Sequence, residues 1–252
     1  MIPGLQGRKV LFIGASTGIG AAAALGFGTN GARVAVHANA SVDKGQAVVD
    51  SIKARGGEAW LVTGDVTKPD VVARIVDQAA AAMGGIDILI NNAGALVKRQ
   101  PLAEFGDEVY DQVLDLNIRS VLHATRCALP HLKKDNGVVI NTTSIAARNG
   151  AGPGAGLYGS AKAFVSNITR TMAKEFAPFG IRANAVSPGT ILTPFHERYS
   201  NAEMLEATRK NVPLGRLGTS EDCVGVYLFL GSNEMSGYIT GQVIEINGGL
   251  LM

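Results

Sequence analysis

Short apolar runs alternate along this chain with longer segments whose apolar residues recur at helical spacing. The short runs are rich in β-branched residues and almost continuously apolar, which is typical of strands buried on both faces. Strands are predicted at Lys9–Ile13, Arg33–His37, Ala59–Thr63, Ile86–Asn91, Val138–Thr142, Arg182–Val186 and Gln242–Ile246. Helices are predicted at Ile19–Thr29, Val42–Arg55, Val71–Met83, Glu108–His131, Leu157–Phe176 and Glu221–Leu230.

The alternation of strand and helix continues to the end of the sequence, and no linker or repeat interrupts it. Such alternation predicts parallel strands joined by right-handed crossovers. We therefore expect an α/β fold with a doubly wound parallel sheet of about seven strands, flanked by helices, as a single domain over residues 1–252. The least regular stretch is Pro188–Leu217, and its polar character indicates a substrate loop or lid at about residues 190–217.

Composition narrows the possible classes of protein. Hydrophobic residues make up 46% of the 252 residues and charged residues 17%, which is enough apolar material for a sizeable core. The net charge of +2 comes without a basic block, so neither nucleic acid nor an anionic membrane is expected as a partner. The N-terminus lacks a signal-peptide pattern, and no apolar run could span a membrane. Cys127 and Cys223 have no neighbouring ligand set, so we expect reduced thiols, no metal and a cytoplasmic location.

A glycine-rich loop, Gly14-x-x-x-Gly18-Ile19-Gly20, follows the first strand and opens a helix. Glycines let a pyrophosphate approach the backbone, and the helix N-terminus offers free N–H groups. The spacing differs from the usual G-x-G-x-x-G of dinucleotide sites. On the glycines alone, a cofactor loop and a plain tight turn both stay open.

Polar residues also follow the fourth and fifth strands, as Asn91-Asn92-Ala93-Gly94 and Asn141-Thr142-Thr143-Ser144. Ligands of open α/β sheets bind beyond the carboxyl ends of the strands. An ordinary Asn/Gly turn explains the first of these segments equally well. Both segments are candidates for a ligand site because they follow strand ends, and not because of their composition.

Tyr158 and Lys162 lie four residues apart in a predicted helix just downstream of Ser144. Their Cβ atoms should be roughly 5–6 Å apart on one helix face. A free tyrosine has a pKa of about 10, so action near pH 7 needs a shift worth about 4 kcal/mol. A cation about 4 Å away supplies about that much at an effective dielectric of 20. We therefore predict that Lys162 activates Tyr158 as an acid/base.

The order of these motifs, ending with Pro188-Gly189, resembles the short-chain dehydrogenase/reductase family from Gly7 to about Gly249. Within that family the chain is similar to β-ketoacyl-carrier-protein reductases and to sugar or polyol dehydrogenases. The resemblance implies a Rossmann-like fold. It also implies an NAD(P)-dependent oxidoreductase that moves a hydride between nicotinamide and a secondary alcohol or ketone, with a 3-oxoacyl, sugar or polyol type of substrate.

The resemblance also implies roles for individual residues. Tyr158 would exchange the hydroxyl proton, Lys162 would lower its pKa and hold the ribose, Ser144 would bind the substrate oxygen, and Asn117 would hold a relay water. Asp65 and Val66 match the adenine contact, and residues 188–193 match the carboxamide contact. The implied cofactor-binding residues are Gly14, Ser16, Thr17, Gly18, Ile19, Gly20, Ala38, Asn39, Ser41, Asp65, Val66, Asn91, Ala93, Gly94, Tyr158, Lys162, Pro188, Gly189, Ile191 and Thr193. Substrate contacts are expected from residues 95–99, 145–157 and 191–211.

The sequence departs from the family pattern in a few places. Ile13 stands where Thr is usual, and Gly159-Ser160-Ala161 rearranges the pair that normally follows the tyrosine. The glycine-rich stretch over residues 150–156 separates Ser144 from Tyr158 by slightly more than usual, which would change the substrate pocket and leave the chemistry intact.

The choice between the two dinucleotides depends on the end of the second strand. Ala38 stands where an enzyme using NAD usually carries an acidic residue. Asn39 follows, and Ser41 could cap the next helix and form an anion site, which favours NADP over NAD. Thr17, where NADP-using relatives often carry Arg, and the nearby Asp43 count against NADP. A merely polar turn remains the alternative.

A non-catalytic cofactor-binding sensor or scaffold on the same fold is the competing function, because fold does not imply function. Such proteins usually lose the tyrosine, the lysine or the serine, and all three are present here together with Asn117. The expected partners are a small-molecule substrate and further copies of the chain. The C-terminal strand over residues 237–249 and the apolar faces of Glu108–His131 and Leu157–Phe176 would build a homotetramer.

Overall fold

A computed structural model describes residues 2–252 and contains one parallel sheet of seven strands. The strands are β1 (Lys9–Ile13), β2 (Arg33–Ala38), β3 (Glu58–Thr63), β4 (Ile88–Asn91), β5 (Val138–Thr142), β6 (Arg182–Pro188) and β7 (Val243–Ile246). Their order in the sheet is β3-β2-β1-β4-β5-β6-β7, with every pair parallel. The order reverses between β1 and β4. This confirms the predicted doubly wound α/β fold and puts the expected ligand crevice beyond those strands.

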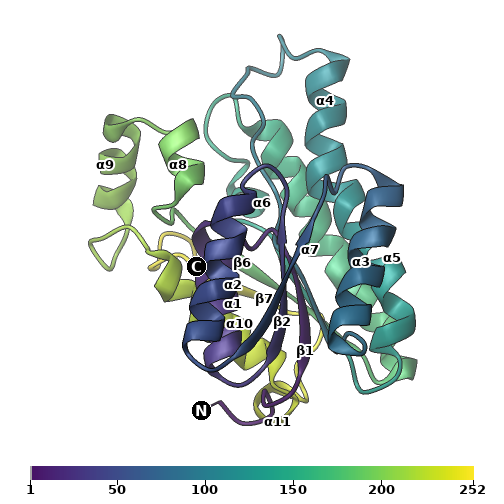
Figure 1. Cartoon of the computed structure of the whole chain (residues 1–252). Helices are drawn as coiled ribbons and strands as arrows, with labels where there is room; N and C mark the ends of the chain where they lie inside the picture. Colours follow the sequence, from purple (N-terminus) through teal and green to yellow (C-terminus); the bar gives the residue numbers. More distant parts are fainter. Residues whose placement is uncertain (1) are drawn as a thin grey trace.

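Helices cover both faces of the sheet, and alternate strand residues enter two different cores. In β1, Val10 and Phe12 pack into one core, while Leu11 and Ile13 pack into the other. The first core is closed by α1 (Gly18–Thr29), α2 (Val42–Ala54) and α10 (Ser220–Gly231). The second is closed by α3 (Pro69–Met83), α5 (Ser120–Leu132) and α7 (Gly156–Phe176), and Figure 1 shows the sheet between the two layers. Burial on both faces is why the strands are almost continuously apolar.

The segment predicted as one helix over Glu108–His131 is divided in the structure. It consists of α4 (Asp107–Leu114), a π-helical segment (Asp115–Arg119) and α5. The three parts follow one another without a loop, so the segment is helical throughout, as its apolar spacing predicts. A π-helical turn contains one extra residue, which a helical pattern does not reveal.

The stretch predicted to be irregular, residues 188–217, contains two helices. These are α8 (Pro194–Tyr199) and α9 (Ala202–Asn211), which stand apart from the two helical layers in Figure 1. Pro194 occupies a first-turn position, and the Asn201 side chain caps α9 by accepting the Met204 N–H at 2.8 Å. Neither helix has a fully buried residue, so neither carries the apolar periodicity that identifies a core helix. Two further short helices, α6 (Ala146–Asn149) and α11 (Asn233–Ser236), also lie outside the predicted set.

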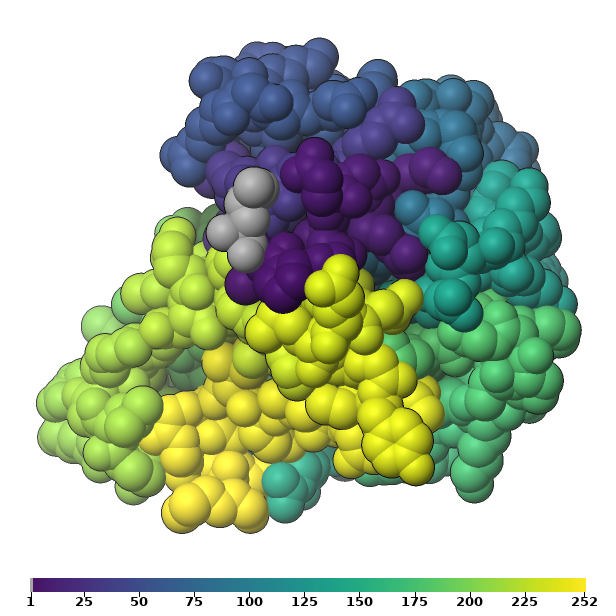
Figure 2. Space-filling model, turned by 90° about the horizontal axis from the view of Figure 1, so that it is seen from below, coloured from purple at the N-terminus to yellow at the C-terminus, as the bar shows by residue number. Residues whose placement is uncertain are grey.

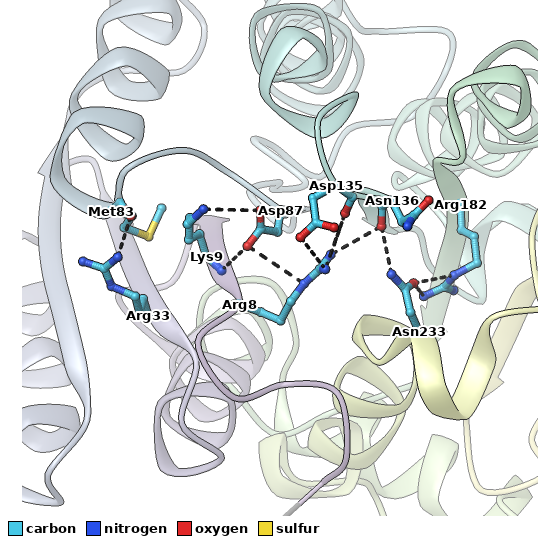
Figure 3. A network of polar contacts seen from close by, with 9 residues as sticks. All are labelled: Arg8, Lys9, Arg33, Met83, Asp87, Asp135, Asn136, Arg182 and Asn233. Atoms are coloured by element: carbon cyan, nitrogen blue, oxygen red, sulfur yellow. Dashed lines mark hydrogen bonds and ion pairs between the residues drawn. The ribbon is translucent and has the colours of Figure 1, made fainter.

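A polar network ties together the amino ends of the strands, at the edge opposite the crevice (Figure 3). Asp87 accepts the Lys9 N–H at 2.9 Å and pairs with the Arg8 side chain at 3.9 Å. Arg182 is buried and donates to Asn233 Oδ1 at 2.7 Å, and Asn233 in turn donates to the Asn136 carbonyl at 2.9 Å. The network joins segments far apart in the sequence.

The same end of the molecule is seen face-on in Figure 2, where the first described residues lie against the segment around α11. Ser232 donates to the Pro3 carbonyl at 2.6 Å, which fastens the amino-terminal segment there. Within residues 2–252, no helix combines the length and apolar character needed to cross a membrane.

Candidate active site

A cavity of about 490 Å³ lies beyond the carboxyl ends of the strands. Its wall is built from the loops after β1, β4, β5 and β6, from α7 and from the region of α8 and α9. Many of the residues singled out in the sequence line it, namely Gly14, Ser16, Thr17, Gly18, Ile19, Ala93, Gly94, Ser144, Tyr158, Lys162, Pro188, Gly189, Ile191 and Thr193. The fold thus brings motifs from the whole chain into one cavity.

Asn91 is not at this cavity. Its Nδ2 donates to Thr125 Oγ1 at 3.1 Å and to Asn141 Oδ1 at 2.9 Å, and the residue is buried. Successive side chains of a strand point to opposite faces, so the next residue, Asn92, is the one that lines the cavity. Asn92 donates to the Gly14 carbonyl at 2.7 Å and joins the loops after β4 and β1.

The loop after β1 fits an anionic group. α1 begins at Gly18, its N-cap Thr17 makes no side-chain cap bond, and its first turn has no acidic residue. The amino end of α1 therefore keeps N–H groups and a positive dipole end available for a pyrophosphate. Gly20 is turned away from the cavity, and a Cβ there would collide with the carbonyl oxygen of Gly14. The close packing of the loop therefore requires glycine at position 20, and the proposed contact of Gly20 with the cofactor stays a prediction.

The remaining predicted cofactor residues lie near this loop but outside the cavity wall. Ala38 ends β2 and is buried, with Gly45 of α2 packed against it. Asn39 is exposed, and Ser41 is the N-cap of α2 but its side chain makes no capping bond. Asp65 Oδ1 accepts the Thr67 N–H at 2.9 Å, which orders the turn after β3, and Val66 is buried beside it. The capping role considered for the Ser41 hydroxyl is therefore not observed.

Tyr158 and Ser144 both line the cavity. The two side chains lie near one another, and Ser144 Oγ accepts the Ala146 N–H at 3.1 Å, which orients the serine. Burial raises the pKa of Tyr158 to about 12, and the nearby Ser144 hydroxyl opposes that shift. Phe195 of α8 packs on the Tyr158 ring with the centroids 5.6 Å apart.

Lys162 lies one turn further along α7 and is 3% exposed. Its Nζ donates to the Thr142 carbonyl at 2.9 Å and lies 5.7 Å from the centroid of the Tyr158 ring. Burial lowers the pKa of Lys162 to about 8. In the cofactor-free protein desolvation dominates the pKa of both groups, so the activation of Tyr158 expected from Lys162 together with a nearby oxidised nicotinamide stays a prediction.

Asn117 lies in the π-helical segment and is fully buried. Its Nδ2 donates to the Val113 and Ala95 carbonyls, each at 2.9 Å, and its Oδ1 accepts the Ala95 N–H at 3.2 Å. Gly94 lies between Asn117 and Lys162, where a Cβ would stand 2.7 Å from Asn117 Oδ1 and 2.8 Å from Lys162 Nζ. The absence of a side chain at Gly94 allows these two polar groups to approach one another.

The three ranges expected to contact substrate all contribute to the cavity wall. Arg99, Asn149 and His196 supply polar groups, and among the described residues no Asp or Glu lines the cavity. Arg99 donates to the Pro153 carbonyl at 2.6 Å and to the Tyr199 carbonyl at 3.2 Å, which links two sides of the wall. Within residues 2–252, no carboxylate forms an ion pair with Arg99.

Some residues at the site had no local signal in the sequence. Leu250 lines the cavity although it is close to the C-terminus. His37 lies outside the wall but contacts Gly14, the first glycine of the loop, through its ring. The one sequence feature that could have pointed to His37 is that this polar residue stands between two apolar residues of a buried strand.

Comparison with known proteins gives matches over nearly the whole chain. A family model described as Enoyl-(Acyl carrier protein) reductase matches residues 14–251. The 3-oxoacyl-[acyl-carrier-protein] reductase FabG of Staphylococcus epidermidis is 36% identical over 246 residues, which cover 97% of this chain and 99% of that protein. The crystal structure of the NADH-dependent reductase A1-R′ responsible for alginate metabolism is 37% identical, with a TM-score of 0.91 and 98% of each chain covered. A short chain dehydrogenase of Burkholderia cenocepacia in complex with NADP is 33% identical, with a TM-score of 0.91, covering 98% of this chain and 99% of that one.

Proposed function

The chain belongs to the short-chain dehydrogenase/reductase family and is an NAD(P)-dependent oxidoreductase acting on CH–OH groups, and from this premise we propose that Tyr158 is its general acid/base. The observation that carries the proposal is that Tyr158, Ser144 and Lys162 line one cavity together with the loop before α1. A group that transfers a proton must lie within hydrogen-bond reach of the reacting oxygen. In the proposed mechanism, both hydroxyl groups reach the same substrate oxygen.

In the reducing direction, the phenol of Tyr158 donates its proton to the substrate oxygen as negative charge develops there. Ser144 donates a hydrogen bond to the same oxygen and stabilises that charge. A bound nicotinamide would supply the hydride, or accept it in the reverse direction. Lys162 adds a positive charge beside the phenol, and Asn117 is positioned by Ala95 to order a relay water.

The cofactor site is proposed to favour NADP over NAD. Ala38 leaves the end of β2 without a carboxylate that would repel a 2′-phosphate, and the Ser41 hydroxyl is not used for capping. One similar protein is described as NADH-dependent and another was solved with NADP, so the family accommodates both dinucleotides. The choice therefore depends on residues of this chain.

The substrate is proposed to be a ketone or secondary alcohol of the 3-oxoacyl, sugar or polyol type. The wall beside Tyr158 combines apolar groups with Arg99, Asn149 and His196, and the residues described there include no carboxylate. Such a wall suits polar substrates that are neutral or anionic, because a cation without an acidic partner attracts negative charge. The alternative of a non-catalytic sensor has no observation in its favour, since Ser144, Tyr158 and Lys162 meet in one cavity.

A cofactor-oxidation assay tests this function directly. The protein is incubated with NADPH or NADH and a panel of 3-oxoacyl thioesters, keto sugars and simple ketones, and the reverse reaction is run with the matching alcohols. Turnover of at least one class that Tyr158→Phe removes would support the proposal. Cofactor binding without turnover of any member would favour the sensor.

We also propose a cytoplasmic homotetramer. Val243, Ile244 and Ile246 of the edge strand β7 are only half-buried, and Tyr238 just before it is fully exposed. Apolar surface on an edge strand is usually covered by a partner. Light scattering at micromolar concentration should give the mass of a tetramer, and a stable monomer would contradict this assembly.

A further inference from the structure

His37 is a buried ionisable group inside β2, and its ring bridges two turns. The residue is 1% exposed, although its neighbours in the strand are apolar. The Gly14 N–H donates to Nδ1 at 3.1 Å, and Nε2 lies 2.9 Å from the Gly64 carbonyl oxygen. A backbone N–H can only donate and a carbonyl can only accept, so the two contacts together assign the proton to Nε2. The imidazole is therefore neutral in this arrangement.

The two turns joined by His37 serve different parts of the proposed dinucleotide site. Gly14 is the first glycine of the loop after β1 and has a left-handed backbone with φ of 81°. The next residue, Ala15, donates its N–H to the backbone carbonyl of His37 at 2.9 Å. Gly64 directly precedes Asp65 and Val66, the proposed adenine contact. His37 thus connects the part of the proposed dinucleotide site that would bind the pyrophosphate with the part that would bind the adenine.

We propose that His37 is a positioning residue for the cofactor, whose neutral ring holds the Gly14 and Gly64 turns in the binding conformation and whose protonation releases the Gly14 turn. The inference rests on the proposed cofactor site. A protonated imidazole carries N–H groups on both nitrogens, so Nδ1 would turn a donor toward the Gly14 N–H. The half-buried Gly14 N–H would then lose its acceptor, and two donors would face one another.

The electrostatic surroundings give the direction of the pH dependence. Burial lowers the pKa of His37 from 6.5, while the bond to Gly64 and the negative charge of Asp65 act in the opposite direction. Asp65 is the charged group that influences the ring from the turn after β3, and the loop Gly14–Gly20 brings no ionisable side chain to it. If bound cofactor requires the neutral ring, affinity is constant above the pKa of His37 in the free protein and falls as the pH decreases below that pKa.

The test is the dissociation constant of NADPH and of NADH, measured by calorimetry between pH 5 and pH 8. Wild-type affinity should fall roughly tenfold at the acid end, the scale of one lost buried hydrogen bond. His37→Asn places an amide oxygen where Nδ1 stands and does not titrate, so it should bind more evenly across this range. His37→Leu removes the acceptor and should bind roughly tenfold more weakly at every pH. Comparing each variant with wild type on the same ligand cancels the titration of the 2′-phosphate of NADPH.

Two controls isolate the contribution of the His37 ring. His131→Gln removes a histidine at the end of α5, outside the cavity wall, and should keep the wild-type pH dependence. Thermal unfolding checks that each variant is folded, and the comparison of wild type with His37→Asn stands even if His37→Leu does not fold. Identical pH profiles in wild type and His37→Asn would overturn the role of His37 while leaving the proposed function intact. Wild-type protein that binds neither dinucleotide at any pH would contradict the proposed function itself.

Discussion

Lys162 donates from Nζ to the backbone carbonyl of Thr142 at 2.9 Å, so its charge is held against the carboxyl end of β5. The same Nζ lies beside Gly94, where any side chain would displace it. The lysine is almost completely buried and forms no ion pair with a carboxylate within residues 2–252. A buried cation in this position costs folding free energy, which agrees with the role proposed for Lys162 in the chemistry.

The first prediction concerns this cost. Burial lowers the pKa of Lys162 from 10.5 to about 8, so at pH 7 the lysine is charged in both the folded and the unfolded state. Lys162→Met removes this buried charge and should therefore stabilise the cofactor-free protein at pH 7. The expected net gain in the free energy of unfolding is on the order of 1–3 kcal/mol, after subtracting the contribution of the lost hydrogen bond to the Thr142 carbonyl. Between pH 8 and 10.5 the unfolded wild type binds more protons than the folded one, so wild-type stability rises toward that of the variant.

Urea unfolding of both proteins at pH 7 and pH 10 measures this difference. Lys174→Met, an exposed position on the same helix, is the matched control and should show no such pH dependence. The free energies of unfolding of wild type and Lys162→Met should differ less at pH 10 than at pH 7. An equal difference at the two pH values would contradict the claim that the buried charge of Lys162 costs stability.

The second prediction is catalytic. Tyr158→Phe keeps the ring, and therefore the packing against Phe195, but removes the proton. Turnover should fall by roughly two to four orders of magnitude, with the dissociation constant of the cofactor nearly unchanged. Because burial raises the pKa of Tyr158 to about 12, the cofactor-free protein should show no tyrosinate absorbance from this residue at pH 9. Near-normal turnover in Tyr158→Phe would contradict the proposed mechanism.

The third prediction concerns the choice of cofactor. Ala38→Asp introduces a carboxylate at the end of β2, beside Gly45. The ratio of kcat/KM for NADPH over NADH should move toward NADH by roughly 1–3 kcal/mol, the scale of a hydrogen bond to a charged group. Ala38→Asn has the same size without the charge and should move the ratio less. Wild-type protein that already prefers NADH strongly would show that the missing carboxylate does not determine the choice.

The fourth prediction concerns Arg99 at the cavity wall. Replacing it by Gln removes the charge but keeps a donor for the Pro153 carbonyl. The kcat/KM for an oxo acid should fall by roughly three- to tenfold, while that for its methyl ester should stay nearly constant. Arg99→Lys keeps the charge and should retain the preference for the acid. Arg198→Gln, on α8 but away from the cavity wall, is the matched control. If Arg99→Gln lowered kcat/KM equally for the acid and the ester, Arg99 would stabilise the structure of the cavity wall and would not bind an anion.

The hydrophobic pattern of this chain was sufficient to locate the seven strands and the core helices, because those elements are buried and their periodicity is a local property. The order of the motifs likewise indicated Tyr158, Lys162 and Ser144, since each motif lies within a few residues of a strand end or helix start. The short helices α8 and α9 escaped the pattern, because an exposed helix carries little apolar periodicity.

Only the tertiary structure decided how the candidate residues are used. It turned Asn91 toward Thr125 and placed Asn92 at the cavity, and it brought His37 against Gly14 and Phe195 against Tyr158. It also showed how strongly burial acts on Tyr158, whose pKa it raises. The physical reason is that desolvation and hydrogen bonding at a site come from residues distant in the chain, so spacing along the sequence does not contain them.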